Sequence, residues 1–383
     1  MNEVIVESYN IITGLGSTAA TNFSMILDGN SGVKLHHRTD IDDEPVWASL
    51  IEEADLFRLT EFITEAENYT KYEKLLIASI RDAAGNTNVN LKSAETVFIF
   101  STTKGNISLL ENEAVSPSLI KRISLSHSAK VVAEYFGNTN EPVVISNACI
   151  SGVVAIMVAK RLLNEGKYKN AIVCGADVIS KFVYSGFKSF QALSAGRCHP
   201  FSENRDGINL GEAAATMIVS IAEKGNSIPG IRILEGAISN DSNHISGPSR
   251  TGDELSHAIA TAIQLSGINQ QDLGFISAHG TATMYNDEME AKAFYSAGLH
   301  SIPVNSLKGF FGHTLGAAGI VESVISIKSL LQNMVVPTEG FTQSGVSVSI
   351  HVSDKPIKLN ANYFLKTASG FGGCNAALVF SKS

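Results

Sequence analysis

The stretch VVISNACISGVVAIMVAKRLL, Val143–Leu163, decides the fold class. Its β-branched start predicts a short buried strand, and the apolar spacing from Ser151 onward predicts a helix. Cys149 stands among small residues at the junction of the two elements. Backbone N–H groups at a helix N-terminus are unpaired and positively polarised, so they stabilise a thiolate and lower the pKa of the thiol. The pattern therefore favours a nucleophilic cysteine, although a cysteine considered alone is usually a buried structural residue.

Composition narrows the classes of protein to which the chain can belong. Its 383 residues, 44% hydrophobic and 17% charged, are typical of one large globular domain or two medium ones. The sequence contains no run of about 18 apolar residues, so we expect no membrane span. The N-terminus does not resemble a secretory signal. The net charge of −8 argues against nucleic acid as the main partner. The four cysteines are widely spaced and form no CxxC pair; they are Cys149, Cys174, Cys198 and Cys374. This spacing indicates a reducing compartment, and we expect the cytoplasm.

Strand and helix patterns alternate along the chain, which is typical of an α/β protein. The predicted buried strands are Thr96–Ser101, Val143–Ser146, Ala171–Cys174 and Phe275–Ser277. The predicted helices are Tyr72–Ala84, Ser126–Phe136, Ser151–Leu163, Asp253–Leu265, Asp287–Ser296 and Ala317–Leu331. Turn-forming residues in Glu223–Pro229 mark the expected joint between a longer first part and a shorter second part.

Two histidines and a lysine follow predicted strand ends elsewhere in the chain. His279 lies in a glycine and threonine loop, before a helix for which Asn286 is the expected N-cap. Lys308 and His313 lie in a second such loop, before a glycine- and alanine-rich helix. Either histidine alone is more often structural, but in open α/β sheets ligands bind outside the carboxyl ends of the strands. Together with Cys149, these residues predict one catalytic site.

Five motifs in order carry a resemblance that spans almost the whole chain. They are NACISG, GRCHPFSENRDGINLGEAAA, AHGTAT followed by NDEMEA, NSLKGFFGHTLGAAGIVES and GFGGCNAALVF. The sequence resembles the elongating, decarboxylating β-ketoacyl-acyl-carrier-protein synthases of the thiolase superfamily. The order Cys, His, His sets this group apart from thiolases, which use two cysteines, and from initiating synthases, which use Cys, His and Asn. The resemblance implies an α/β fold, thiolase-like and five-layered (αβαβα), made of two similar halves. Residues 1–225 form the half with the nucleophile, and residues 226–383 form the half with the histidines and the lysine.

The resemblance also implies roles for particular residues. Cys149 is the nucleophile, His279 and His313 are the paired histidines, and Lys308 is the supporting cation. Further residues of the implied site are the carboxylate Glu322 near the lysine, the acidic residues Asp287 and Glu290, and the phosphopantetheine contacts Thr281 and Thr283. Phe371 is the implied gate, and its backbone N–H joins that of Cys149 in an oxyanion hole. The implied docking residues for carrier protein are Lys121, Arg122 and Arg205.

The implied enzyme is an acyltransferase that holds an acyl group on Cys149. It condenses this group with malonyl-acyl carrier protein and releases CO₂. This decarboxylative Claisen condensation extends a fatty-acid, polyketide or aryl-polyene chain by two carbons. We expect no metal and no cofactor apart from the phosphopantetheine of the carrier protein, because histidine N–H groups supply the electrophilic help. The expected partners are acyl carrier protein and a second subunit, either an identical chain or a synthase-like sister chain.

Several residues depart from the common family pattern. His199 and Ser202 replace the usual arginine and aspartate before RDG. Ser369 stands where a phenylalanine often precedes the gate, and Cys374 stands where threonine is common. These changes favour a specialised pathway, such as polyketide or aryl-polyene extension. An alternative function is that of a chain-length-factor-like structural subunit, which binds carrier protein beside an active synthase. Such subunits usually lack the nucleophile, so the intact Cys149 favours the enzyme.

Overall fold

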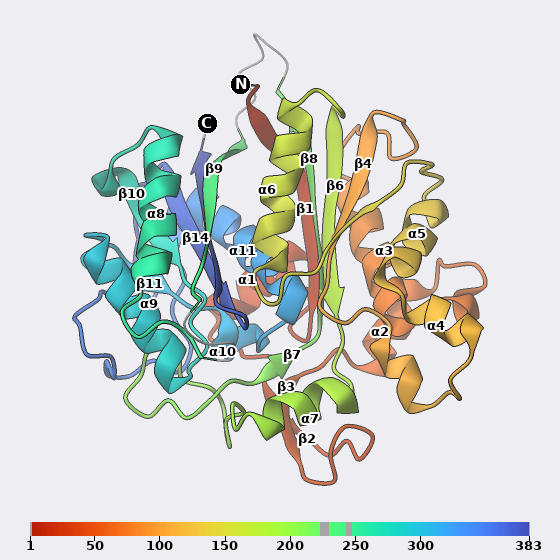
Figure 1. Cartoon of the computed structure of the whole chain (residues 1–383), viewed down its shortest axis with the longest axis horizontal. Helices are drawn as coiled ribbons and strands as arrows, with labels where there is room; N and C mark the ends of the chain where they lie inside the picture. Colours follow the sequence, from red (N-terminus) through yellow and green to blue (C-terminus); the bar gives the residue numbers. More distant parts are fainter. Residues whose placement is uncertain (1, 223–229, 243–246, 383) are drawn as a thin grey trace.

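A ten-stranded mixed sheet organises the part of the chain that the computed structural model describes, residues 2–222, 230–242 and 247–382 (Figure 1). In order across the sheet, the strands are β11 (Val304–Asn305), β10 (Leu273–Ser277), β14 (Tyr363–Gly370), β15 (Cys374–Lys382), β9 (Ile231–Asn240), β1 (Val4–Thr13), β8 (Ala213–Ile221), β6 (Asn170–Asp177), β4 (Thr96–Ser101) and β5 (Val143–Ile145). Two small sheets accompany it: β2 (Lys34–His36) with β3 (Val46–Ser49) and β7 (Leu210–Gly211), and β12 (Met334–Val335) with β13 (Ile357–Lys358).

The ten strands divide into two halves with the same topology. One half runs β1, β8, β6, β4, β5, and the other runs β9, β15, β14, β10, β11. In each half the first two pairings are antiparallel and the last two are parallel. The halves join where β1 and β9 pair antiparallel. The expected fold of two similar halves is therefore confirmed. The expected joint at Glu223–Pro229, with the boundary between residues 225 and 226, lies outside the described residues.

Helices cover both faces of each half and so produce five layers. The central layer contains α6 (Ser151–Asn164) and α11 (Ala318–Leu331), which pack on each other and on strands of both halves, with α1 (Ala19–Leu27) beside them. The outer face of the first half is covered by α2 (Glu53–Thr60), α3 (Lys71–Ala84) and α5 (Leu125–Tyr135). The outer face of the second half is covered by α8 (Asp253–Ser266) and α9 (Met284–Ser296) (Figure 1). The order of layers is αβαβα, as the resemblance implies.

The alternation of side chains along β4 explains why both faces of the sheet are covered. Val97 and Ile99 enter the central apolar core, whereas Phe98 and Phe100 enter the outer core beneath α3. A strand that is buried on both faces needs an apolar run instead of an alternating pattern. The predicted buried strands are confirmed in β4, β6 and β10. β5 differs, because it is the last strand of the sheet and its residues Val143–Ile145 are only half-buried.

The predicted helices are confirmed as α3, α5, α6, α8, α9 and α11. The start of α9 differs, because this helix begins at Met284 with Thr283 at its N-cap. The expectation that Asn286 caps it is therefore wrong. Within the described residues, the structure adds five helices to those predicted: α1, α2, α4 (Pro117–Ile123), α7 (Lys181–Ser189) and α10 (Lys308–Phe311). Within the described ranges, no helix is long and apolar enough to cross a membrane.

Candidate active site

Cys149 lies in a tight turn between β5 and α6. Ala148 has a φ of 42°, in the left-handed region that residues with a side chain rarely adopt. The Ser151 hydroxyl donates to the Ala148 carbonyl oxygen at 2.6 Å and accepts from the Asn147 N–H at 2.8 Å. These contacts hold the turn at the start of α6, where Ile150 is the N-cap. The turn thereby fixes the thiol just beyond the carboxyl end of a strand.

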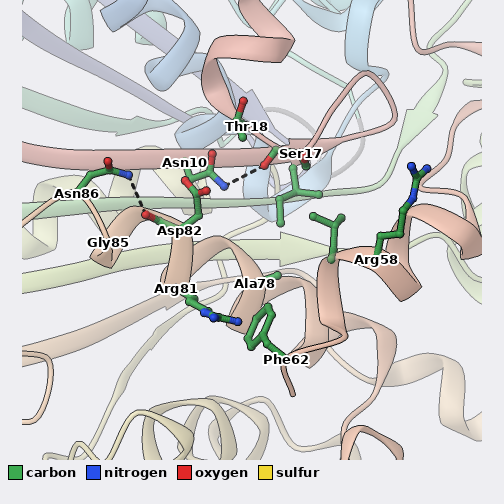
Figure 2. Close-up of a pocket in the computed structure, with 12 residues that line it drawn as sticks. Asn10, Ser17, Thr18, Arg58, Phe62, Ala78, Arg81, Asp82, Gly85 and Asn86 are labelled. Atoms are coloured by element: carbon green, nitrogen blue, oxygen red, sulfur yellow. Dashed lines mark hydrogen bonds between the residues drawn. The ribbon is translucent and has the colours of Figure 1, made fainter. Parts of the chain in front are cut away.

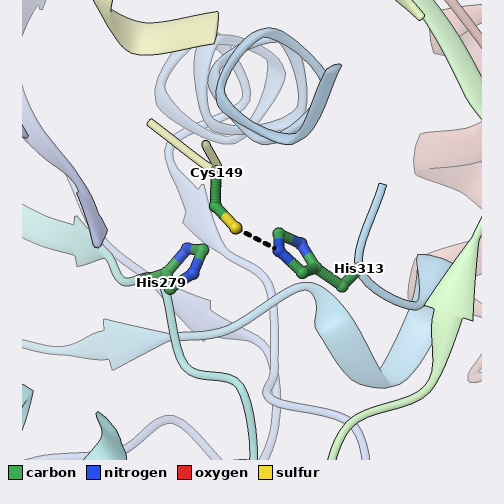
Figure 3. A group of neighbouring side chains, drawn as sticks. All are labelled: Cys149, His279 and His313. Carbon is green, nitrogen blue, oxygen red and sulfur yellow. Dashed lines mark hydrogen bonds between the residues drawn. The ribbon is translucent and has the colours of Figure 1, made fainter. Parts of the chain in front are cut away.

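Figure 3 shows the three side chains that meet at this edge of the sheet. Cys149 comes from the turn before α6, His279 follows β10, and His313 follows α10. His313 Nε2 lies 2.9 Å from Cys149 Sγ, and the two imidazole ring centres are 5.2 Å apart at an interplanar angle of 84°. All three residues are buried. A thiol from the first half and two imidazoles from the second half therefore share one site.

Burial sets the protonation states of these groups. It raises the pKa of the Cys149 thiol to about 12, and the nearby Lys308 ammonium offsets this effect only in part. The sequence-based expectation of a lowered thiol pKa is therefore wrong, because desolvation disfavours the thiolate. Burial also lowers the pKa of His279 and of His313 well below the ordinary value, with Lys308 as the next cause. Near neutral pH the site holds a thiol and two neutral imidazoles.

Lys308 connects His279 to a buried carboxylate. Its Nζ donates to the His279 carbonyl oxygen at 2.8 Å and lies 3.5 Å from His279 Nδ1. The same fully buried ammonium pairs with Glu322 on α11. An ammonium N–H directed at Nδ1 favours the tautomer that carries its proton on Nε2. His279 is thereby prepared to donate a hydrogen bond from Nε2.

The same three side chains also form a possible donor set for a metal ion. The sulfur of Cys149 and one nitrogen each of His279 and His313 lie within 4.8 Å of one another. Thiolate and imidazole are typical ligands of Zn²⁺, but each ligand must be deprotonated. The thiol is protonated near neutral pH, and Lys308 favours a proton on His279 Nε2. This donor set fits hydrogen bonding to a thioester oxygen better than it fits a metal.

Two buried carboxylates of α9 hold the loop that follows β10. Glu290 accepts the N–H groups of His279 at 2.8 Å and of Gly280 at 2.6 Å. Asp287 accepts the N–H of Thr281 at 2.9 Å. Burial raises the pKa of Asp287 to about 7 and also raises that of Glu290. The structure thus places both predicted acidic residues against the backbone of the loop that carries His279.

The predicted phosphopantetheine contacts lie in this same loop. Thr281 is buried and Thr283 is half-buried. Their hydroxyl oxygens are 2.9 Å apart, so either hydroxyl can donate to the other. The two threonines stand two and four residues after His279 in the chain.

The predicted gate lies in the hairpin between β14 and β15. A Cβ placed on Gly370 would lie 3.0 Å from the backbone nitrogen of Cys149, so the hairpin packs closely on the nucleophile turn. Phe371 follows in the hairpin and is 41% exposed. Gly372 has a φ of 89°, which favours glycine at this turn. The hairpin therefore brings the Phe371 backbone close to the Cys149 turn.

An aromatic cluster, Phe187, Phe190 and Phe371, extends from the imidazoles to the surface. The Phe371 ring centre lies 5.8 Å from that of Phe187 and 5.4 Å from that of Phe190. Phe187 meets the His313 ring edge-on at 6.4 Å. Phe190 is 58% exposed, so the outer side of the cluster faces solvent.

The three predicted docking residues have different surroundings. Lys121 is exposed on α4. Arg122 binds the buried carboxylate of Glu73 with both terminal nitrogens. Arg205 is only 5% exposed, and its guanidinium donates to backbone carbonyl oxygens, including that of Gly345 at 2.7 Å. The expectation that Arg205 contacts a carrier protein is therefore wrong, because this charge is used inside the fold.

Two buried charged residues beside the site escape the sequence analysis. Lys366 on β14 is fully buried and pairs with Glu322 at 2.6 Å. Asp177, at the end of β6, accepts the Thr102 hydroxyl at 2.8 Å and the Gly316 N–H at 2.7 Å. The sequence feature that could have identified both residues is a charged residue within an otherwise apolar strand pattern. Such a residue is fully buried only when it is paired.

A surface cavity lies elsewhere, where α2 and α3 approach β1 (Figure 2). Its lining includes Arg81, whose guanidinium lies 3.6 Å from the centre of the Phe62 ring. Asn10 also lines it and donates to the Ser17 carbonyl oxygen at 3.1 Å. None of the lining residues is a predicted site residue. Arg81 and Asn10 thus both have partners within the fold.

Two family models match the chain. The Beta-ketoacyl synthase N-terminal domain matches residues 1–224, and the Beta-ketoacyl synthase C-terminal domain matches residues 231–342. Together with the thiolase-like fold, these matches define the class: the chain belongs to the β-ketoacyl synthase family.

Individual relatives cover nearly the whole chain. The 3-oxoacyl-[acyl-carrier-protein] synthase 2 of Mycobacterium leprae is 28% identical over 98% of this chain and 96% of the relative. Among solved structures, the ishigamide ketosynthase/chain length factor has a TM-score of 0.89 at 23% identity and covers 100% of this chain and 99% of its own. The ketosynthase ApeO in complex with its chain length factor ApeC, from Xenorhabdus doucetiae, has a TM-score of 0.83 at 23% identity, with coverages of 100% and 98%. These two structures share the fold.

Proposed function

We propose that this chain is an acyltransferase that condenses malonyl-acyl carrier protein with an acyl group held on Cys149. The observation that carries the proposal is the 2.9 Å contact between Cys149 Sγ and His313 Nε2, with His279 facing the same point. A nucleophile with one base would serve a hydrolase, whereas a second imidazole with its own lysine serves to stabilise an enolate. The product is a β-ketoacyl carrier protein that is two carbons longer than the acyl donor.

The first half-reaction transfers the acyl group to Cys149. His313 Nε2 accepts the thiol proton, which overcomes the high pKa that burial gives the thiol. The sulfur attacks the thioester carbon, and the N–H groups of Cys149 and Phe371 stabilise the oxyanion. Loss of one such donor typically costs about 10²–10³ in rate. The tetrahedral intermediate then expels the phosphopantetheine sulfur, which takes the proton from His313.

The second half-reaction forms the carbon–carbon bond. Once Sγ is acylated it no longer donates to His313, which can carry its single proton on Nε2 as His279 does. Malonyl-carrier protein binds with its thioester near Thr281 and Thr283. The two N–H groups then donate hydrogen bonds to the thioester oxygen while the C–CO₂ bond of the malonyl group breaks. The enolate carbon attacks the acyl carbon, and the Cys149 sulfur leaves as a thiolate, which takes a proton from solvent to restore the resting thiol. Release of CO₂ supplies the driving force.

The acyl donor that we propose is an unsaturated or aromatic chain from a specialised pathway, such as polyketide or aryl-polyene extension. The cluster of Phe187, Phe190 and Phe371 supports it, because conjugated groups stack favourably on aromatic rings. The two similar solved structures are described as ketosynthases with chain length factors, which agrees with a specialised role. A saturated fatty-acid chain is the competing donor, and the assay below includes it.

Partners follow from the surface of the chain. We propose that carrier protein, which is acidic, docks near the exposed Lys121 and the adjacent Arg122. We also propose a dimer that pairs through the open edge of β5, either with a second copy or with a sister subunit. All four cysteines are free thiols, which supports a reducing cytoplasm as the location.

The alternative is a structural subunit that binds carrier protein without catalysis. The naming of chain length factors in similar structures favours it. The arrangement of Cys149, His279, His313 and Lys308 weighs against it, because a structural subunit gains nothing from a buried thiol beside two neutral imidazoles.

Intact-protein mass spectrometry tests the proposal. We expect acyl-carrier protein to load one acyl group on the wild-type chain and none on Cys149→Ala. Addition of malonyl-carrier protein should discharge the adduct as a β-ketoacyl product. A panel of saturated, polyunsaturated and aryl donors identifies the preferred chain. No loading, alone or with candidate sister subunits, would support the structural alternative.

A further inference from the structure

Lys366 is a second buried ammonium close to the two imidazoles. It lies on β14 at the register position that pairs with Ser277, the last residue of β10. Its Nζ donates to the carbonyl oxygens of Ser277 at 3.1 Å and Ala278 at 3.2 Å. These two residues lead directly into His279. Lys366 therefore holds the strand end from which this imidazole projects.

Glu322 joins Lys366 to Lys308. One carboxylate oxygen lies 2.6 Å from Lys366 Nζ, and the other pairs with Lys308 Nζ. Lys308 in turn donates to the His279 carbonyl oxygen at 2.8 Å. Three successive carbonyl groups, at residues 277–279, are thus bound by two ammonium groups that share one carboxylate. Two ammonium groups can stay buried beside a single carboxylate only if such ion pairs and hydrogen bonds compensate their lost hydration.

We propose that Lys366 is a positioning residue for the condensation. It fixes Glu322 and the end of β10, so Lys308 stays directed at His279 and both histidines stay neutral when the enolate forms. This inference rests on the proposed function and extends it. Without Lys366, Glu322 would have Lys308 as its only ammonium partner among the described residues, and the ammonium would be drawn away from His279 Nδ1.

The charge of Lys366 also has a chemical consequence. Titratable or charged groups face the histidines from every neighbouring element; they are Lys308, Lys366, Glu322, Glu290, Asp287, Asp177 and Cys149. The Lys366 ammonium contributes to the lowered pKa of both histidines. A histidine that is protonated can give its proton to the enolate carbon. That transfer yields acetyl-carrier protein, and no carbon–carbon bond forms.

Lys366→Met and Lys366→Gln test the proposal, with Lys160→Met as the matched control. Lys160 is another buried lysine that pairs with a glutamate, Glu235 at 2.6 Å, but its contacts lie on β9, away from the histidines. Each variant is assayed from pH 5 to 9 for Cys149 loading, CO₂ release, and the ratio of acetyl-carrier to β-ketoacyl product. Thermal unfolding reports whether each variant is folded.

For Lys366→Met we expect Cys149 loading to change little and condensation at pH 7 to fall about 10- to 100-fold, because the imidazole is displaced. The acid side of the pH profile should move to higher pH, because the Lys366 ammonium lowers the pKa of both histidines, and the acetyl fraction should rise. Lys366→Gln keeps a donor for the carbonyl groups but not the charge, so it should recover part of the rate and keep the shifted profile. Lys160→Met should show neither the shift nor the acetyl product.

Three results would overturn the inference. One is a wild-type pH profile and product ratio in both Lys366 variants. Another is failure of both variants to fold while Lys160→Met folds, which would make Lys366 a structural residue. The third is a wild-type chain that loads Cys149 but forms no β-ketoacyl product with any partner subunit. In that case the proposed function fails first, and the variants are not the cause.

Discussion

A buried thiol beside a neutral imidazole is a different nucleophile from a free thiolate. Desolvation raises the pKa of Cys149 to about 12, so the thiol keeps its proton at neutral pH. His313 Nε2, 2.9 Å away, can take that proton as a thioester is attacked. Fast reaction at neutral pH then depends on a bound thioester, because His313 takes the thiol proton as the sulfur adds to the carbonyl carbon.

Alkylation by iodoacetamide tests this property of Cys149. We expect slow reaction at pH 7 and a rate that rises about tenfold per pH unit through pH 10, because the thiolate is the reacting species. Peptide mapping by mass spectrometry at several pH values measures the rate, with Cys149→Ala to identify the peptide. Cys174 is 0% exposed and provides an internal control that should react more slowly still. A rate that levels off below pH 8 would show a lowered thiol pKa instead.

At the scale of elements, a close crossing of α6 and α11 sets the geometry of the site. Gly152 of α6 faces Gly319 of α11. A Cβ on Gly319 would lie 2.4 Å from the Val153 nitrogen, closer than any real contact. α6 begins at the nucleophile turn, and α11 carries Glu322. The crossing therefore fixes the nucleophile relative to the carboxylate that supports the histidines.

Gly319→Ala should destabilise the chain by about 1–3 kcal/mol, because the added methyl group forces the two helices apart. Gly186→Ala is the matched control, since a Cβ there meets no described heavy atom within 4 Å inside α7. The Gly186→Ala substitution should stabilise the folded chain by up to about 1 kcal/mol, because alanine has a higher helix propensity than glycine. Urea unfolding followed by circular dichroism measures both. Equal effects of the two substitutions would contradict the close crossing.

The elements that the sequence predicts well are those with a strong local period. β4 and α6 follow from a continuous apolar run and a helical apolar spacing. Properties that depend on tertiary burial do not follow from local pattern. The raised pKa of Cys149, the internal role of Arg205 and the pairing of Lys366 with Glu322 all depend on residues distant in the chain. The start of α9 is missed because the helix begins three residues earlier, at Met284, and Asp287 lies at the end of its first turn, where it accepts from the Thr281 N–H of the preceding loop.

At the scale of the whole molecule, the two edge strands of the ten-stranded sheet, β11 and β5, differ in how far the chain covers them. At one end, β11 is covered by its own chain: the Val304 N–H donates to His351 and the Val304 carbonyl accepts from Ser353, both at 2.8 Å. At the other end, β5 ends the sheet and its residues are only half-buried. An uncovered edge strand readily pairs with another chain. The two halves thus differ at β5, which is the edge at which we propose that a partner subunit binds.

Val144→Lys tests whether β5 is that interface. In size-exclusion chromatography with light scattering, a self-dimer of the wild-type chain should have twice the monomer mass of 40.7 kDa, and a heterodimer should have the summed mass of the two different chains. A lysine on β5 should convert the complex to monomer, because a charged side chain on an edge strand disfavours pairing of that strand with another chain. Val144 also packs on the apolar cluster that contains Phe98 and Phe100, so circular dichroism is used to check that the variant is folded. Leu265→Lys is the matched control, since Leu265 is 59% exposed on α8, far along the chain from β5. A wild-type chain that stays monomeric with every candidate partner would contradict the interface. Loss of the complex in both variants would place it elsewhere on the surface.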